Sequence, residues 1–505
     1  MPHPTQASSA PRHSARLVSQ RARSDTRLRA ILRVFGVLLV LFSLTMLPPT
    51  AVSLWYQDGE IKSFLLTFGM TLALGLLLWL PAHNARAELR TRDGFIIVAL
   101  FWVGLGLLSA LPFVIGPHLG YSDSVFEAVS AFTTTGATTI IGLDELPRSI
   151  LYYRQQLQFL GGMGIIVLAV AVLPLLGIGG MQLYRAETPG PMKDEKLTPR
   201  IGHTARTLWF IYVGLTAACA YGYWLAGMEA FDAIGHSFAT LSTGGFSTHD
   251  ASMGYFKSLP IEAITELFMV LGATNFGLLF VAWQQRSLWH LLNDTEVRAF
   301  LGIVLAVVGV EASILAYTGH TGLGEGLRQA LFQVISCITS TGFTTTDFSV
   351  WPLFLPTLLV FVGFVGGCGG STAGGLKVLR VVLLFRNSRL EARKLLHPRL
   401  VASVKLKGRV VPQRVMDGIW GFFALYIAAF AVLMLAVMAT GVDQVTAFSA
   451  VATCINNMGP GLGEVSANFV AQSATVKWLL VLAMWLGRLE MFTLLVLLAP
   501  TLWRV

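Results

Sequence analysis

Four short phrases that end in glycine recur along the chain and carry groups suited to binding a cation. They are Thr134-Thr135-Gly136, Ser242-Thr243-Gly244, Ser340-Thr341-Gly342 and Asn457-Met458-Gly459. Glycine allows φ > 0 and a close approach of neighbouring backbones, so each phrase predicts a tight turn. Backbone carbonyl oxygens in such turns can replace the hydration shell of an ion, as in potassium-channel filters. One Thr-Gly phrase usually only caps a helix, but four predict a shared cation site.

The fourth phrase departs from the other three. Asn457 and Met458 stand where the others have Ser or Thr, so a hydroxyl that could add an oxygen ligand is lost. Backbone carbonyls remain available there. We therefore expect a fourfold site with imperfect symmetry.

Each phrase follows an apolar run that is too short to cross a membrane. These runs cover residues 124–134, 231–241, 327–339 and 445–456. Apolar segments of about 10–14 residues are typical of re-entrant helices, and non-helical backbone at membrane depth is stable only inside protein or beside a water-filled cavity. We expect four pore helices, each aiming its partly negative C-terminal end at the ion.

The composition requires a membrane. Of 505 residues, 54% are apolar and 12% are charged, with a net charge of +9 and a mean hydropathy of +0.66, whereas soluble domains carry about 25% charged residues. A water-soluble enzyme, a disordered chain, a secreted disulfide scaffold and a coiled coil are thereby excluded. The four cysteines are far apart and predict small buried apolar side chains. The predicted fold class is an all-α membrane protein.

Ten segments have the length and apolarity of a membrane span. They cover residues 34–55, 62–81, 95–117, 155–178, 206–227, 261–284, 298–318, 352–385, 415–439 and 476–500. Lys and Arg concentrate in the N-terminal tail and in alternate loops, above all in residues 377–414, which places those loops and both termini in the cytoplasm.

The spans and phrases divide the chain into six parts. We expect a disordered basic tail over residues 1–33, two extra helices over 34–92, and four span–pore helix–filter–span repeats over 93–200, 201–295, 296–411 and 412–505. The repeats would form a pseudo-tetrameric pore around one axis.

The span at 352–385 is interrupted by glycines. They include Gly366, Gly367, Gly369, Gly370, Gly374 and Gly375. A nucleotide-binding loop needs Lys followed by Ser or Thr after a glycine, and this spacing does not fit. Close helix packing through small residues is one alternative. Because each glycine costs about 1 kcal/mol of helix propensity, we prefer a flexible intramembrane loop below the filter.

Arg488 lies near the middle of the last span. Insertion of arginine there costs about 2.5–3.5 kcal/mol, so it should face the pore or a partner. An ion pair with Glu490 is the alternative, although residues two apart do not share a helix face.

With these motifs the sequence resembles the TrkH-type subunits of the Trk/Ktr/HKT superfamily of potassium transporters, over residues 34–502. The resemblance implies inward K⁺ conduction across a bacterial inner membrane by a homodimer. It also implies potassium selectivity from glycine in all four phrases, an intramembrane gate loop, and an arginine at Arg488 that narrows the pore. Finally, it implies a cytosolic regulatory subunit that binds NAD or ATP.

Other functions stay open at this stage. A proton- or sodium-coupled K⁺ symporter is the main alternative, with Glu266, Glu311 and Glu490 as acids inside the spans. A membrane enzyme has no motif in its favour, so we expect no enzymatic activity, no organic cofactor bound by this chain and no nucleic-acid partner. K⁺ would be the transported ion. Residues 377–414 would bind the regulatory subunit or anionic membrane lipid.

Overall fold

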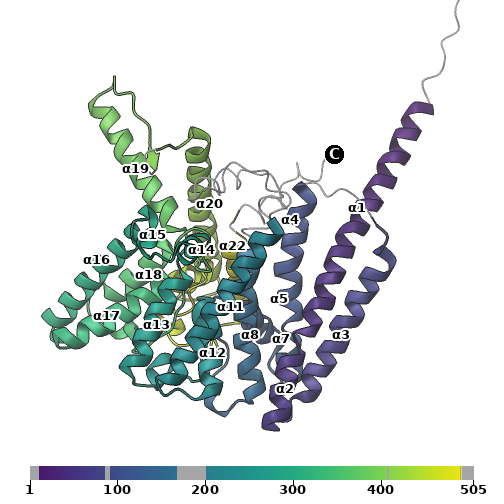
Figure 1. Ribbon diagram of the computed structural model, residues 1–505, viewed down its shortest axis with the longest axis horizontal. Helices are drawn as coiled ribbons and strands as arrows, with labels where there is room; N and C mark the ends of the chain where they lie inside the picture. The colour runs from purple at the N-terminus through teal and green to yellow at the C-terminus, as the bar shows by residue number, and fades with distance from the viewer. Residues whose placement is uncertain (1–10, 86–90, 168–200, 407–408, 490, 492–505) are drawn as a thin grey trace, which may run out of the picture.

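The computed structural model describes residues 11–85, 91–167, 201–406, 409–489 and 491. Within these residues the chain is helical apart from one two-stranded antiparallel hairpin, β1 (Lys405–Leu406) and β2 (Arg409–Val410). The predicted all-α class is confirmed. Figure 1 shows the helices as a compact bundle, with α19 protruding at one end and the pair α1 and α3 along one side.

The N-terminal helices form a separate layer on the bundle. They are α1 (Pro11–Leu44), α2 (Leu47–Tyr56) and α3 (Ile61–Trp79), which continues into a short turn, η1 (Leu80–Ala82). Gly36 and Gly75 let α1 and α3 approach closely, because a Cβ atom on Gly36 would lie 2.8 Å from the Gly75 carbonyl oxygen.

The expectation of disorder up to residue 33 is wrong from Pro11 onward, where Ala, Arg and Leu favour helix.

Four short helices lie where pore helices were predicted. They are α7 (Tyr121–Phe132), α12 (Ala230–Leu241), α17 (Leu323–Ile338) and α21 (Gln444–Ile455). Nearly every residue of α7 and α21 is buried. These helices are therefore surrounded by protein, as polar helix ends at membrane depth require.

The other helices flank these four. Before the second short helix lie α4 (Thr91–Ala99), the π-helical turn η2 (Leu100–Gly104), α5 (Leu105–Leu108), α6 (Leu111–Ile115), α8 (Arg148–Val167) and α11 (Ile201–Leu225). After it lie α13 (Leu259–Gly272), α14 (Phe276–Gln284), α15 (Trp289–Leu292), α16 (Thr295–Tyr317), α18 (Leu355–Val365), α19 (Val378–Leu396), α20 (Gln413–Met438) and α22 (Ala474–Arg488). Single 3₁₀ turns occur at η3 (Leu143–Glu145), η6 (Ser252–Tyr255), η7 (Phe348–Val350) and η8 (Gly463–Val465).

Six helices in the described part of the chain are long and apolar enough to cross a membrane, or seven if the bent pair α13 and α14 forms one span. The predicted spans 155–178 and 476–500 extend outside the described residues, so the count of ten stays a prediction.

Two predicted spans are broken. The glycine segment separates α18 from α19, as predicted. The span predicted over residues 261–284 is also broken, because α13 and α14 meet at an angle of 101°. Asn275 explains the break: its side-chain oxygen accepts a hydrogen bond from the Leu278 amide at 3.1 Å and caps α14.

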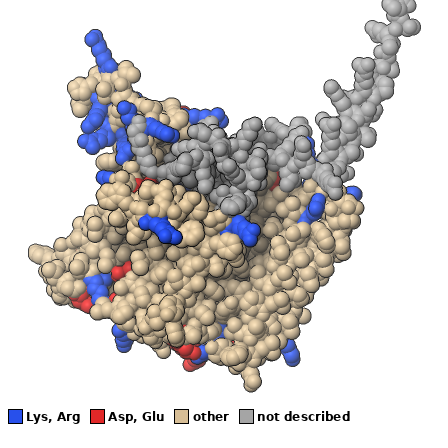
Figure 2. Space-filling view, viewed as in Figure 1, with Lys and Arg blue, Asp and Glu red and all other residues tan. Residues whose placement is uncertain are grey.

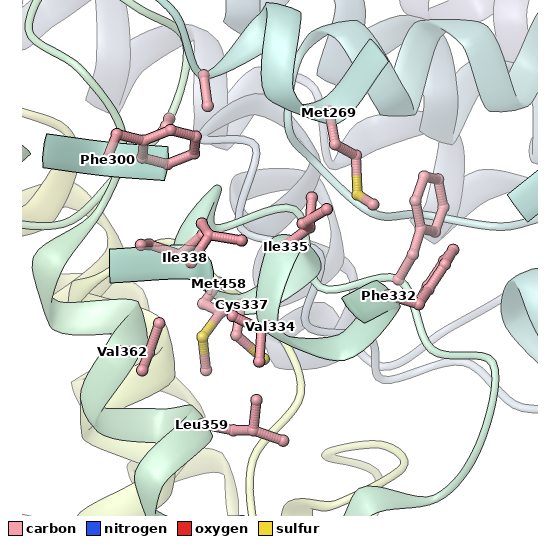
Figure 3. Packing of buried hydrophobic residues seen from close by; sticks show 14 of the residues in the cluster. Met269, Phe300, Phe332, Val334, Ile335, Cys337, Ile338, Leu359, Val362 and Met458 are labelled. Atoms are coloured by element: carbon pink, nitrogen blue, oxygen red, sulfur yellow. The ribbon is translucent and has the colours of Figure 1, made fainter. Parts of the chain in front are cut away.

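The third short helix shows how the core holds a pore helix in place. Figure 3 shows Phe332, Ile335 and Ile338 of α17 among side chains from other helices, including Met269 and Phe300. All four cysteines are buried and unpaired, as predicted. The short helices are thus fixed by apolar contacts on most of their surface.

Candidate functional site

Each of the four short helices ends in a turn, and the four turns have the same backbone conformation. The residue after each C-cap has a left-handed conformation, with φ of 53° at Thr134, 52° at Thr243, 54° at Ser340 and 52° at Asn457. The next amide in each turn donates to the carbonyl five residues back. These bonds are Thr135 to Ser130 (2.8 Å), Gly244 to Ala239 (2.8 Å), Thr341 to Ser336 (2.9 Å) and Met458 to Thr453 (2.8 Å). This is the Schellman arrangement, formed here with non-glycine residues at φ > 0, each costing about 1–3 kcal/mol.

The second turn has a register one residue later than predicted. Gly136, Gly342 and Gly459 follow their left-handed residue by two positions and have φ of 82°, 80° and 95°, and in the second turn that position is Gly245, with φ 75°. The prediction aligned Gly244 with these glycines, because Ser-Thr-Gly looked like the other phrases. Structurally Gly244 corresponds to Thr135, Thr341 and Met458. Gly245 is the site residue that the sequence reasoning missed.

The four turns close into a ring, in chain order. A Cβ atom on any of the four glycines would collide with the carbonyl oxygen of the residue before the glycine in the next turn. The pairs are Gly136 with Gly244, Gly245 with Thr341, Gly342 with Met458, and Gly459 with Thr135. The last contact, 2.8 Å, joins the fourth turn to the first. Glycine is thus required at these positions both by φ and by the neighbouring backbone.

An open cavity of about 410 Å³ lies against one side of this ring. Its lining includes all four ring glycines, together with charged side chains of the loops that follow the turns, among them Asp250 and Asp347. Both carboxylates also support local structure: Asp250 accepts hydrogen bonds from the Gly142 and Leu143 amides, and Asp347 from the Ser349 amide. The cavity is a polar mouth that leads to the ring.

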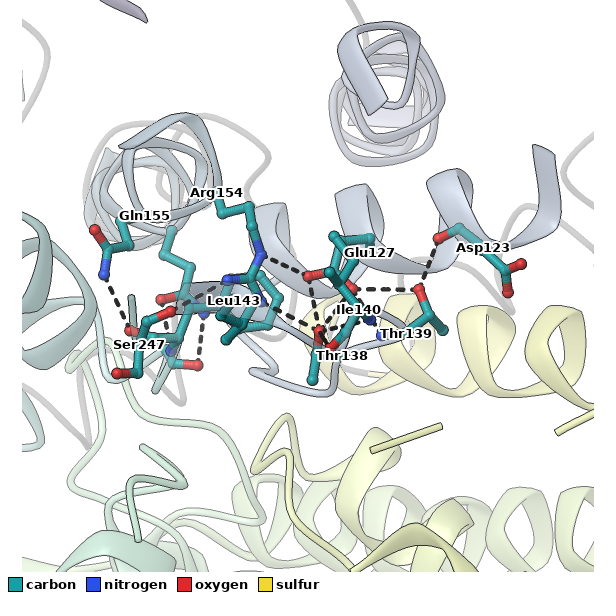
Figure 4. Close-up of polar contacts among 12 residues, drawn as sticks. Asp123, Glu127, Thr138, Thr139, Ile140, Leu143, Arg154, Gln155 and Ser247 are labelled. Carbon is teal, nitrogen blue, oxygen red and sulfur yellow. Dashed lines mark hydrogen bonds and ion pairs between the residues drawn. The ribbon is translucent and has the colours of Figure 1, made fainter. Parts of the chain in front are cut away.

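A buried ion pair next to the first turn stabilises the backbone that follows it (Figure 4). Arg154 on α8 contacts Glu127 on α7 at 2.8 Å, and both side chains are almost fully buried. Glu127 also accepts from the Thr139 amide at 2.8 Å, and Arg154 donates to the Ser247 carbonyl at 3.1 Å. The pair therefore links the segments after the first and second turns.

Two further side chains brace the second turn. Gln158 donates to the Gly244 carbonyl at 2.6 Å and accepts from the Phe246 amide at 3.1 Å. His236 lies 2.8 Å from both the Asp232 carbonyl and the Ser247 hydroxyl. Arg154 and Gln158 were not singled out from the sequence, although charged and amide side chains at the start of an apolar span were a usable signal.

The glycine segment lies on the side of the ring opposite the cavity. The Thr372 hydroxyl lies 3.0 Å from the Leu241 carbonyl and 2.9 Å from the Gly272 carbonyl. The Gly374 amide donates to the Ser340 hydroxyl at 2.5 Å. A Cβ atom on Gly374 would collide with the Asn456 carbonyl. Residues 366–377 are therefore packed directly under the second, third and fourth turns.

The glycines of this segment are needed for its backbone conformation and close packing. Gly366, Gly370 and Gly375 have φ of 73°, 73° and 74°, a conformation that other residues rarely adopt. Gly367 packs against Ala373 and Ala273, and Gly369 offers its carbonyl to Asn275 at 2.6 Å.

Arg488 connects the segment to the ring. Its Nη1 donates to the Thr372 carbonyl at 3.1 Å, its Nη2 donates to the Thr134 hydroxyl, and the side chain is 6% exposed. Among the described residues no carboxylate forms an ion pair with Arg488; Glu490, the alternative partner considered above, lies outside them. Beside Arg488 is a cavity of only about 40 Å³, lined also by Gly375 and Tyr426. A cation leaving the ring here would meet an arginine and little space.

The fold and site define a class: an all-helical membrane protein in which four backbone turns surround one axis. Comparison with known proteins narrows this. The sequence model of the TrkH cation transport proteins matches residues 60–504. The chain belongs to this family.

Named relatives and one solved structure agree. The chain is 53% identical to the Trk system potassium uptake protein TrkH of Vibrio parahaemolyticus, over 94% of this chain and 99% of that protein. It is 52% identical to TrkH (94% and 99%) and 43% identical to TrkG (95% and 100%) of Escherichia coli K12. The crystal structure of the potassium transporter TrkH from Vibrio parahaemolyticus has a TM-score of 0.88 and 50% identity, over 94% of this chain and all of that one.

Proposed function

We propose that this protein is the ion-translocating subunit of a Trk system and conducts K⁺ inward across a bacterial inner membrane. The closed ring of four turns carries the proposal, because it places backbone from all four turns around one axis at the floor of an open mouth. The potassium uptake proteins to which the chain is 52–53% identical support the choice of ion.

The ring would act as the selectivity filter. In this proposal K⁺ sheds water in the mouth and is coordinated by carbonyl oxygens of the turns, while four helix C-termini add negative potential. The filter residues are Thr134, Thr135, Gly136, Thr243, Gly244, Gly245, Ser340, Thr341, Gly342, Asn457, Met458 and Gly459, with Ser242 preceding the second turn.

The glycine segment and Arg488 would form the gate. The segment fills the space under three turns, and a positive charge in a narrow, weakly polarisable passage repels K⁺ far more strongly than in water. Opening then requires residues 366–377 to leave the ring and Arg488 to release Thr372 or Thr134.

A separate regulator would control that step. We propose a cytosolic nucleotide-binding subunit that docks on the basic region at α19, the β1–β2 hairpin and the start of α20, in a homodimeric assembly with both termini cytoplasmic. Figure 2 shows Lys and Arg gathered over α19. The name of the relatives, a Trk system protein, supports a system of more than one component.

The experiment is isotopic uptake in cells that lack their own K⁺ uptake systems. Expression of the chain should restore K⁺ or Rb⁺ accumulation, and an excess of Na⁺ should compete only weakly. Failure of well-expressed, membrane-inserted protein to restore uptake would contradict the proposal.

One observation favours the alternative of a proton-coupled symporter. Glu311 on α16 is fully buried, and neither carboxylate oxygen has a hydrogen-bond partner in the described part of the chain. An acidic side chain without a partner inside a span is a candidate carrier of protons. If Glu311→Gln abolishes K⁺ uptake driven by a pH gradient but leaves Rb⁺ exchange intact, the protein is a proton-coupled symporter and not a simple conductor of K⁺.

A further inference from the structure

A groove of about 1060 Å³ opens on the outside of the bundle between α11 and α14. Its walls are formed mainly by apolar side chains, among them Phe210, Leu215, Leu279, Trp283 and Leu288. Trp283 and Leu288 are largely exposed. A groove on a membrane-facing surface is filled by lipid or by another protein.

The bend between α13 and α14 creates this groove. Because α14 turns away from α13 by 101°, a groove lies between α14 and residues 207–215 of α11. Gly214 forms part of the wall, and no atom lies within 4 Å of the position its Cβ would take. Gly214 therefore leaves this part of the groove open.

The end of the groove is polar and basic. Gln284 at the end of α14 lines it together with the following Arg286 and Ser287, and the exposed side chains of His290 and Arg298 come later in the sequence. The start of α14 is bonded to the glycine segment, which lies on the side of the ring opposite the mouth. Basic pockets between membrane helices on this side bind anionic headgroups, and tryptophan favours the membrane interface.

The groove is also connected to the proposed gate. The residues at the bend bond to the glycine segment: Asn275 Nδ2 donates to the Gly369 carbonyl at 2.6 Å, and the Phe276 amide to the Gly370 carbonyl at 3.2 Å. In return the Cys368 amide donates to the Ala273 carbonyl at 2.8 Å. A shift of α14 relative to α11 would therefore be transmitted to the segment under the ring.

We propose that the α11–α14 groove binds one anionic phospholipid, with its phosphate at Arg286 and an acyl chain along Gly214, and that the bound lipid controls the position of the glycine segment. The claim that the lipid controls the glycine segment rests on the proposed function, whereas the claim that the lipid binds in the groove does not. Charge complementarity at Arg286 selects an anionic over a zwitterionic headgroup, and the apolar walls require an acyl chain.

The binding test uses native mass spectrometry of purified protein with phosphatidylglycerol or phosphatidylcholine. Gly214→Leu fills the groove, and Arg286→Gln removes its charge. We expect the first variant to abolish one tightly retained phosphatidylglycerol and the second to weaken it about fivefold. Matched controls are Gly302→Leu, another position where a Cβ meets nothing within 4 Å, and Arg298→Gln, an exposed arginine of α16 that does not line the groove.

Unchanged phosphatidylglycerol retention in folded Gly214→Leu protein would overturn the lipid site. A change of oligomeric state in that variant would assign the groove to a second copy of the chain and also overturn it. Rb⁺ flux in proteoliposomes with and without phosphatidylglycerol then tests the claim that the lipid controls the glycine segment. Equal flux in both lipids, with binding confirmed, would contradict gating while leaving both the site and the transport function standing.

Discussion

Arg488 shows what a single side chain contributes to the closed state. It carries a buried positive charge under the ring and also donates hydrogen bonds to Thr372 and Thr134. A barrier of roughly 1–2 kcal/mol from this charge corresponds to about a tenfold change in flux. We expect Arg488→Gln, which keeps donors but removes the charge, to raise Rb⁺ flux about tenfold at an unchanged Rb⁺/Na⁺ ratio.

Arg488→Lys is the matched control for charge. It retains the positive charge and loses the fixed geometry of the guanidinium, so its flux should stay near that of the unaltered protein. Flux is measured in proteoliposomes per monodisperse, folded protein. Reduced flux in Arg488→Gln would identify the arginine as a scaffold residue instead.

His249 in the mouth predicts a pH dependence. Burial lowers its pKa, but the nearby carboxylates of Asp232 and Asp144 outweigh burial and raise the pKa above the ordinary 6.5. The stabilising pairs are therefore complete below about pH 6.5 and are lost as the pH rises through the raised pKa. The difference in melting temperature between unaltered protein and His249→Gln should shrink over that rise. A difference that is constant with pH would exclude the charged pair.

At the scale of elements, the ring is held by what packs behind it. Glu127 and Arg154 connect α7 to α8, and both are buried. Glu127→Gln would leave a buried arginine without its counter-charge, at a cost of about 3–5 kcal/mol. We expect a lower melting temperature and a lower Rb⁺/Na⁺ ratio, both partly restored by adding Arg154→Met. No restoration in the double variant would mean that the pair has further roles.

The closed position of the glycine segment depends on Thr372. Its hydroxyl lies within hydrogen-bonding distance of two backbone carbonyls outside the segment, whereas among the described residues the neighbouring Ser371 hydroxyl bonds to the Cys368 carbonyl inside it. Thr372→Val should therefore raise basal flux without the regulatory subunit, and Ser371→Ala should not. Equal effects of the two variants would argue against a gate held at Thr372.

The short helices and the broken span 352–385 could be predicted from the sequence, because run length and glycine density are local signals. The register of the second turn could not. Two adjacent glycines, Gly244 and Gly245, made that register ambiguous, and only the backbone of the neighbouring turns decides it. The sequence marks Arg154 and Gln158 as polar residues in an apolar span, but it does not reveal their partners, which lie in distant segments.

At the scale of the whole molecule, the mouth and the basic region lie on opposite sides of the ring. Because all four native cysteines are buried, single new cysteines can report sidedness. Val401→Cys near α19 is expected to react with a membrane-impermeant maleimide only from the cytoplasm, and Ser252→Cys near the mouth only from outside. Both positions reacting from the same side would contradict the orientation.

The central claim is that Gly136, Gly245, Gly342 and Gly459 form the selectivity filter. The measurement is the Rb⁺/Na⁺ uptake ratio of each glycine-to-serine variant, compared with Gly441→Ser, a glycine of similar φ that meets nothing within 4 Å. A side chain at a ring glycine displaces the carbonyl of the next turn, so the ratio should fall in all four ring variants and stay constant in the control. Unchanged ratios in all four folded ring variants would contradict the claim.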